Sequence, residues 1–152
     1  MKKDFVHLVY MLVVLVVSGA AEELVPQIFN VGVPVLLSAA AYSAVCRTPV
    51  EGLLFALAAG GMEDSLSSLP FATSIGFFVA QFALLRSFKL PLATALPAFA
   101  LYQFWVWMWL GSRYSGGLSL RILASVPVGA LTLALVCLAM RWLDGKAAMN
   151  EK

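Results

Sequence analysis

Charged residues are scarce in this sequence. They make up 12% of its 152 residues, hydrophobic residues make up 62%, and the mean hydropathy is +0.92. A water-soluble domain has about 25% charged and about 45–50% apolar residues. The chain has too little polar surface to face water, so we expect a single-domain integral membrane protein. Its net charge of +2 is too small and scattered to favour nucleic-acid binding.

Histidine and cysteine are almost missing. The sequence has one histidine, His7, and two cysteines, Cys46 and Cys137, which lie inside apolar runs. No two of these residues lie at a metal-ligand spacing, and no polar loop holds a cysteine pair for a disulfide framework. We interpret the cysteines as small core-packing residues and expect no metal and no cofactor.

Long apolar runs, in contrast, fill most of the chain. A membrane-spanning helix needs about 20 apolar residues, with a range near 17–25. We therefore predict an all-α integral membrane protein that folds as a six-helix transmembrane bundle. Its spans are expected at residues 5–21, 26–46 with a break near Pro34, 49–64, 71–88, 92–110 and 120–143.

Polar residues and prolines mark the expected ends of these spans. Glu22 and Glu23 are expected to end the first helix, and residues 144–152 to form a solvated tail. Pro26 and Pro34 interrupt the next run, because proline removes a backbone hydrogen bond and clashes with the preceding turn. Residues 24–33 are therefore expected as an interfacial or re-entrant piece, with a kinked span as the alternative.

The first apolar run also has features of a secretory signal. Two lysines precede it, and small residues follow it before the first glutamate. Because residues 5–21 are long for the apolar core of a signal, we favour an uncleaved first span. Cleavage would not reverse the orientation of the spans that follow.

The stretch Pro49–Ile75 predicts a membrane hairpin around which the other spans are arranged. Thr48, Pro49 and Glu51 form a capping-box pattern that starts a helix. Small residues then recur at four-residue spacing, which lets a neighbouring helix approach closely. We expect this face to pack within the chain, with a second protein as the alternative. The face consists of Gly52, Ala56 and Gly60.

Glu63 and Asp64 form the acidic tip of the hairpin. Ionisable groups close to hydrocarbon are costly, so they usually pair or mark function. Neighbouring helix residues point about 100° apart, so the two carboxylates cannot face one acceptor. We expect one to reach Arg113 or Arg121 while the other caps a helix or faces water. Their role stays open between ordinary interfacial acids, a structural clamp or partner contact, and a proton or cation pathway.

The basic residues favour one orientation in the membrane. Cytoplasmic loops carry an excess of lysine and arginine. Six spans put only Arg113 and Arg121 on the side of the acidic tip and the remaining basic residues on the other, so both termini are expected in the cytoplasm. The remaining basic residues are Lys2, Lys3, Arg47, Arg86, Lys89, Arg141, Lys146 and Lys152.

Aromatic residues gather toward the end of the fifth span. Tyr102, Trp105, Trp107 and Trp109 follow one another closely. Tryptophan and tyrosine concentrate at headgroup level, so we interpret the three tryptophans as interfacial anchors. An aromatic ligand cage is the alternative.

This topology does not favour catalysis. A serine nucleophile needs a base within reach. His7 is expected on the cytoplasmic side and the serine-rich link 65–68 on the other, separated by about 30 Å of hydrocarbon. We therefore predict that the protein is not an enzyme.

Residues 34–89 contain a recognisable order of features. An apolar helix follows Pro34, and after a basic turn a second helix opens on Gly52. A glycine-rich run through Gly60 ends at Asp64, and a short link leads to Pro70 and another apolar helix. In these features the chain resembles the bacterial rod-shape-determining protein MreD family. It departs from the family at two places, with Val35 for an acidic residue and Ala72-Thr73 for the usual Leu-Gly, which suggests a divergent member.

The resemblance implies a non-enzymatic scaffold of the bacterial inner membrane that belongs to the cell-elongation machinery for peptidoglycan synthesis. Such a protein works with MreC, and through it with the MreB filament, RodA and a class-B penicillin-binding protein. It also implies a fold like that of the substrate-binding subunits of energy-coupling-factor vitamin transporters. Membrane lipid and an MreC-like protein are therefore the expected partners.

A substrate-binding subunit of such a transporter is the alternative function. It predicts an enclosed polar pocket roofed by residues 22–33 and 111–119. Those subunits dock through small residues on the first helix, but here the first helix is bulky, with small residues only at its far end. The sequence therefore favours the scaffold.

Overall fold

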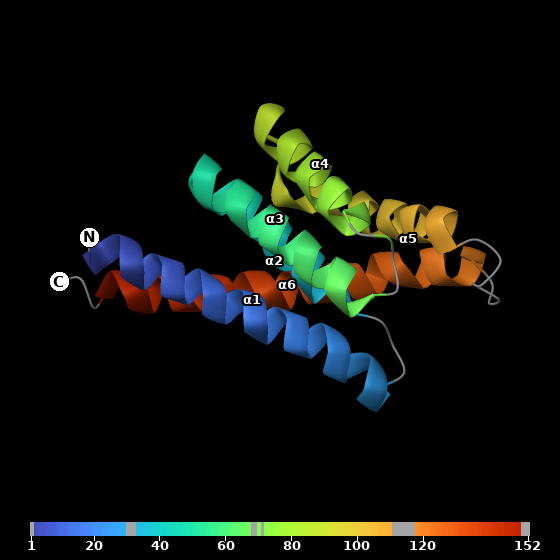
Figure 1. The fold of residues 1–152 in the computed structure, drawn as a ribbon, viewed down its shortest axis with the longest axis horizontal. Helices are drawn as coiled ribbons and strands as arrows, with labels where there is room; N and C mark the ends of the chain where they lie inside the picture. Colours follow the sequence, from blue (N-terminus) through green and yellow to red (C-terminus); the bar gives the residue numbers. More distant parts are fainter. Residues whose placement is uncertain (1, 30–32, 68–69, 71, 111–117, 150–152) are drawn as a thin grey trace.

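The protein is helical throughout the part that the structure describes. The computed structural model describes residues 2–29, 33–67, 70, 72–110 and 118–149, and these contain no β-strand. Figure 1 shows one bundle with both chain termini at the same end. The all-helical fold expected from the sequence is confirmed. Its elements are α1 (Lys2–Phe29), α2 (Val35–Cys46), α3 (Pro49–Leu66), α4 (Thr73–Ser87), the short 3-10 helix η1 (Leu92–Ala95), α5 (Leu96–Leu110) and α6 (Leu118–Met149).

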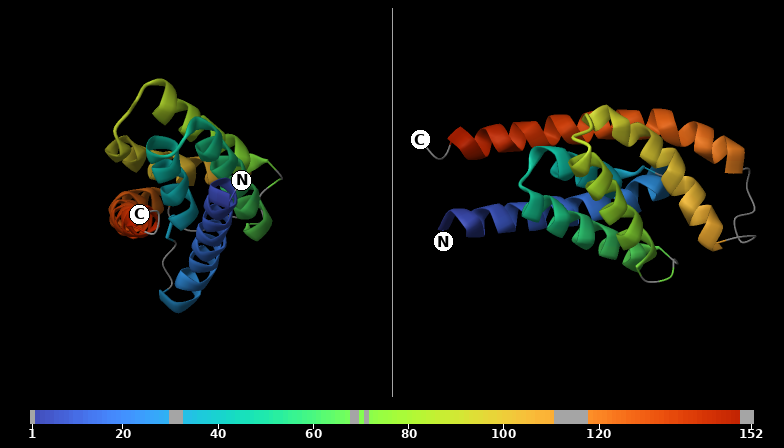
Figure 2. Two further views of the ribbon diagram at one scale, coloured as in Figure 1. Left: turned by 90° about the vertical axis from the view of Figure 1, so that its left-hand side faces the viewer. Right: turned by 90° about the horizontal axis from the view of Figure 1, so that it is seen from above.

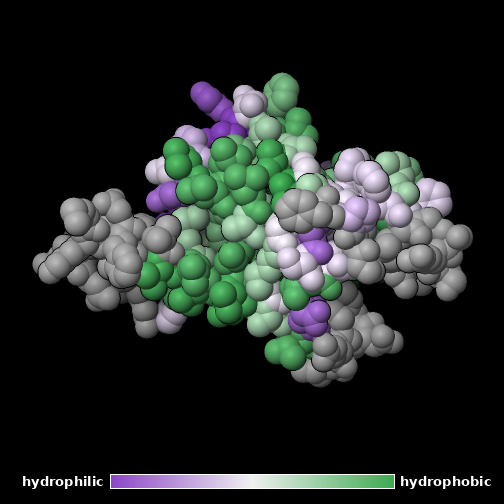
Figure 3. Space-filling model, viewed as in Figure 1, coloured by the Kyte–Doolittle hydropathy of each residue, from purple (hydrophilic) through white to green (hydrophobic). Residues whose placement is uncertain are grey.

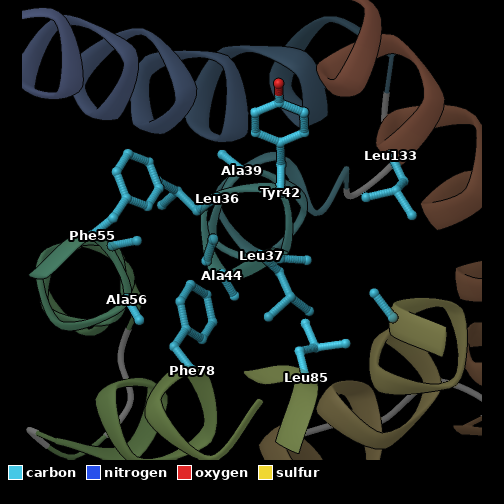
Figure 4. Close-up of a cluster of buried hydrophobic side chains, with 14 of the residues drawn as sticks. Leu36, Leu37, Ala39, Tyr42, Ala44, Phe55, Ala56, Phe78, Leu85 and Leu133 are labelled. Atoms are coloured by element: carbon cyan, nitrogen blue, oxygen red, sulfur yellow. The ribbon is translucent and has the colours of Figure 1, made fainter. Parts of the chain in front are cut away.

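The short helix α2 lies at the centre of the bundle. Every residue from Leu36 to Ala44 is buried, and α1, α3, α4, η1 and α6 all contact this helix. Figure 4 shows α2 end-on, with Leu37 and Phe78 among the side chains that fill the space around it. Because α2 has 12 residues, it is about 18 Å long.

The remaining helices surround α2. In the right-hand view of Figure 2, α2 lies between α1 and α6. Helices α3 and α4 form an antiparallel hairpin, and α5 packs along α6. The capping box expected at the start of α3 is confirmed, with Thr48 Oγ1 accepting from Glu51 N–H and Glu51 Oε2 accepting from Thr48 N–H.

Helix α1 is longer than the sequence predicted. The prediction that Glu22 and Glu23 end this helix is wrong, because α1 continues through them to Phe29. Glutamate is a good helix former, and Glu22 Oε2 accepts a hydrogen bond from the backbone N–H of Leu36 at 2.7 Å. The carboxylate therefore has a partner without ending the helix. The interfacial or re-entrant piece expected over residues 24–33 is helical as far as Phe29, and residues 30–32 lie outside the described residues.

Helix α6 also extends beyond its predicted end. Residues 144–152 were expected to form a solvated tail, but α6 continues to Met149. Asp144 accepts a hydrogen bond from Tyr42 Oη at 3.0 Å and pairs with Arg47. These contacts join the last turns of α6 to the end of α2, so this part of the tail prediction is wrong.

The small-residue face of α3 packs inside the bundle. Gly52, Ala56 and Gly60 are all buried. A Cβ atom on Gly60 would lie 2.6 Å from Ile75 Cα, and one on Gly52 would lie 3.0 Å from the Ser43 backbone oxygen. The backbones of α4 and α2 thus occupy the space that larger side chains would need.

One described stretch, Val126–Gly145 in α6, is long and apolar enough to cross a membrane, judged by length and composition alone. Helix α2 is apolar but shorter. Helices α4 and α5 have 15 residues each, fewer than a perpendicular span of about 20 requires. The six spans expected from the sequence therefore stay a prediction.

The close approach at Gly60 generates a prediction. Gly60→Ala is expected to lower the free energy of unfolding by about 1–3 kcal/mol, as overpacking in a well-packed interior does, because the new Cβ meets backbone atoms of α4. Thermal unfolding in detergent measures the change. Gly76→Ala is the matched control, since a Cβ there meets nothing within 4 Å. Equal stability of the two variants would contradict the prediction.

Candidate functional site

A group of polar side chains lies where α2 and α4 begin. We call it the acidic cluster; its residues come from four helices, and Glu22 also binds the start of α2. It consists of Glu22 on α1, Glu63 and Asp64 on α3, Ser74 on α4 and Tyr102 on α5.

Asp64 caps the start of α4 from the end of α3. The residue before α4, Ala72, makes no side-chain cap and has a left-handed backbone with φ of 69°. Asp64 replaces the missing cap, since Oδ1 accepts from Ser74 N–H at 2.7 Å and Oδ2 from Ile75 N–H at 3.4 Å. The N-terminus of a helix favours a negative charge, so the buried carboxylate stabilises the turn between the two helices.

Glu63 ends a directed chain of hydroxyl hydrogen bonds. Tyr102 Oη donates to Glu63 Oε1 at 3.1 Å and lies 2.9 Å from Ser74 Oγ. A hydroxyl has one proton to donate, so Ser74 Oγ must donate to Tyr102 Oη. The chain thus runs from α4 through α5 to α3. The two adjacent acids face different partners, as their 100° separation on the helix requires.

Glu22 performs the capping role at the start of α2. Its carboxylate accepts from the Leu36 N–H, and Pro34, the residue before α2, supplies no side-chain cap. Glu22 lies just beyond the predicted first span. Burial raises the pKa of its carboxyl well above the ordinary value, and the nearby Glu63 charge adds to the rise. The acidic cluster therefore includes two carboxyls close enough to repel each other.

Aromatic rings enclose Tyr102. Its ring centroid lies 5.1 Å from that of Phe77 and 5.8 Å from that of Phe78. Trp105 Nε1 donates to the Thr73 backbone oxygen at 3.1 Å, so this tryptophan also helps to hold α5 against the start of α4. The sequence did not predict this internal contact, and the interfacial role of Trp105 stays a prediction.

The other two predicted anchors, Trp107 and Trp109, lie on the outer surface. Trp107 is 36% exposed and Trp109 51% exposed. Trp107 stacks on Phe104, with ring centroids 5.8 Å apart, and Trp109 meets Trp105 edge-on at 6.2 Å. Their role as interfacial anchors stays a prediction.

The described residues do not include the side chains of the two arginines that were predicted as charge partners of the acidic tip. Arg113 lies outside the described residues, and Arg121 lies in α6 where the side chain is not described. Within the described part, hydrogen bonds from N–H and O–H groups of the chain hold Glu63 and Asp64. Sequence reasoning placed both acids at a helix end but gave no signal for Tyr102 as their neighbour, because that contact spans 39 positions.

A second polar group lies at the opposite end of α2. Arg86 Nη1 donates to the backbone oxygens of Ala44 at 3.2 Å and Arg47 at 3.0 Å. Arg47 pairs with Asp144 and lies 5.1 Å above the ring centroid of Tyr10. Helix α2 thus has a carboxylate at its N-terminus and a guanidinium at its C-terminus, the arrangement that its dipole favours.

Chemically, the acidic cluster is equipped to hold helices together. The described residues include no group of three or more histidine, cysteine, aspartate or glutamate side chains that could hold a metal ion. Each hydrogen bond that the acidic cluster makes joins it to a helix start or connects two helices. The arrangement favours the structural clamp among the roles that the sequence left open.

Comparison of the chain with known protein families, curated proteins and solved structures finds no match. The site must therefore be interpreted from its own geometry.

The capping role of Asp64 is testable. Asp64→Ala removes the acceptor of two N–H groups, and a buried unpaired group costs about 1–3 kcal/mol, so the unfolding temperature should fall. Asp64→Asn keeps one acceptor oxygen and should lose less. Glu51→Ala removes a capping side chain from an exposed helix start, where water can replace it, and serves as the control. A larger loss for Glu51→Ala than for Asp64→Ala would contradict this role.

Gln81 on α4 allows a prediction of increased stability. Its side chain is buried, and neither amide atom has a hydrogen-bond partner in the described structure. Gln81→Met keeps the length and removes the unpaired amide, which should raise the free energy of unfolding by about 1–3 kcal/mol. Thermal unfolding in detergent measures the change, with Gln81→Asn as the control that keeps the amide. A less stable methionine variant would show that the amide has a partner.

Proposed function

We propose that this chain is a non-enzymatic scaffold of the bacterial inner membrane, a divergent member of the MreD family that binds an MreC-like partner. The observation that carries the proposal is the distribution of polarity. Apolar side chains cover the outside of the bundle, while the carboxylates of the acidic cluster bind helix starts and neighbouring helices inside it.

Helices α1, α3, α4, α5 and α6 each carry exposed apolar side chains. Monomeric soluble proteins rarely expose large contiguous apolar patches. Figure 3 shows one such face, where hydrophobic side chains form a continuous area between hydrophilic ones at either end. The exposed residues include Leu12, Val13, Val16 and Val17 on α1, Leu54 and Leu57 on α3, Leu84 on α4, Leu101 and Met108 on α5, and Leu131, Leu135, Leu138 and Trp142 on α6.

The charges at the two ends of α2 support the proposed orientation. Arg47 and Arg86 lie at its C-terminus, and Glu22 lies at its N-terminus beside the acidic tip of α3. An end rich in arginine and lysine is the one retained in the cytoplasm. Both termini lie at one end of the bundle (Figure 1), as an even number of spans requires.

The features that carry the MreD resemblance hold the α2–α4 unit together. Pro34 directly precedes α2, Gly60 admits the backbone of α4, and Asp64 caps α4. Because residues of the MreD-like sequence pattern make these helix contacts, the contacts support membership of the MreD family.

The small residues of α1 favour the scaffold over the transporter subunit. Ser18 is buried, and a Cβ on Gly19 would lie 2.3 Å from Met62 Cε on α3. Docking through α1, as the transporter subunits do, requires a small-residue face that points outward. Here α3 occupies that face, so a partner must use another surface.

Crosslinking and co-purification from native membranes test the proposal. We expect recovery of a single-span protein with a periplasmic coiled coil, and we expect no recovery of an ATP-binding cassette module. Recovery of the ATPase module with the wild-type chain would replace the scaffold with the transporter subunit.

A reporter inserted after Lys89 tests the orientation. Because the turn between Arg86 and Lys89 belongs to the basic end, it should be shielded from impermeant labels in intact cells and labelled after lysis. Labelling of this turn from outside intact cells would overturn the orientation and the scaffold interpretation that depends on it.

A further inference from the structure

A hollow of about 280 Å³ lies at the basic end of the bundle, between the last turns of α2 and α4. This volume is near the lower bound of about 300 Å³ for small-molecule sites. The hollow combines two cations with apolar side chains and has no carboxylate in its lining. We call it the basic hollow, and it is lined by Ala44, Val45, Leu85, Arg86, Lys89 and Leu90.

Arg86 gives the basic hollow a fixed positive group. Two hydrogen bonds from Nη1 to the backbone oxygens at the end of α2 hold the guanidinium in place. A guanidinium has five N–H donors in one plane, so three remain beyond the two on Nη1. A positioned guanidinium with donors to spare suits a phosphate, because the planar group matches phosphate oxygens in pairs.

Lys89 is placed by the way α4 ends. The backbone N–H of Leu90 donates to the Leu85 oxygen at 3.0 Å, and that of Lys89 donates to the Arg86 oxygen at 3.3 Å. These bonds form a Schellman motif, whose left-handed position usually holds glycine. Here Lys89 occupies this position with φ of 49°. A charged side chain therefore lies at a backbone position that favours glycine, which has no side chain.

Apolar surface adjoins the cations. Val45 lines the hollow and is 36% exposed, and Phe88, which precedes the lining residue Lys89 in the chain, is 68% exposed. A free phosphate ion has no apolar part that could contact this surface, whereas the acyl chain of a phospholipid would cover it. In the proposed orientation this end lies at the cytoplasmic headgroup level, where anionic lipids concentrate.

We propose that the basic hollow binds an anionic phospholipid, with Arg86 and Lys89 contacting its phosphate and Val45 and Phe88 contacting an acyl chain. This inference rests on the proposed membrane location. It adds to the proposed function a class of ligand and a binding site, which lies at the end of the bundle opposite the acidic cluster.

Native mass spectrometry of the full-length detergent-purified protein tests the inference by titration with phosphatidylglycerol and with phosphatidylcholine. Wild type should retain phosphatidylglycerol preferentially. Lys89→Gly should weaken that binding about fivefold, the equivalent of about 1 kcal/mol for one basic residue near an anionic headgroup. Its thermal stability should be unchanged or higher, because glycine adopts the left-handed conformation freely.

Arg141→Gln is the matched control. It removes one exposed positive charge from α6, and Arg141 does not line the hollow. It should bind phosphatidylglycerol as wild type does. Equal weakening in both variants would overturn the site, and displacement of the lipid by inorganic phosphate alone would overturn the lipid as its ligand. If wild type shows no preference for phosphatidylglycerol but still needs detergent for its extraction from membranes, the lipid site is rejected and the membrane location is not. Extraction without detergent would reject the membrane location as well.

Discussion

The buried helix α2 imposes the main constraint on this structure. Its sides contact five other elements, so water cannot reach most of it. A buried backbone N–H or C=O without a partner costs several kcal/mol in an apolar environment. The structure meets this requirement with side chains from other helices, since Glu22 accepts at the first turn and Arg86 donates at the last.

The same requirement explains how charge is arranged in the rest of the bundle. Carboxylates are favoured at helix starts and basic groups at helix ends, and Asp64 repeats at α4 what Glu22 does at α2. The acidic cluster and the guanidinium groups of Arg47 and Arg86 are thus sorted to opposite ends of α2, about 18 Å apart, while Asp144 pairs with Arg47 at the basic end. That sorting agrees with the lysine and arginine distribution in the sequence, and it relates helix capping to the proposed orientation.

The polar residues with known contacts thus serve mainly to hold helices together, and exposed apolar side chains remain on the exterior. The proposed scaffold function needs a rigid shape more than a reactive group. The directed chain from Ser74 through Tyr102 to Glu63 ties three helices together, and the close approach at Gly60 joins two of them without bulky side chains. Lys89 differs from these residues, because its left-handed backbone ends α4 and does not join one helix to another.

Sequence alone was sufficient for features that depend on a few neighbouring residues. The apolar helices and the capping box of Thr48 and Glu51 follow from local composition and three-residue spacing. It failed at Glu22, where the expected helix end depended on a partner 14 positions away, and it could not pair Glu63 with Tyr102 across 39 positions. Tertiary structure alone decided which N–H or hydroxyl each carboxylate meets, because those partners approach one another only when the helices pack around α2.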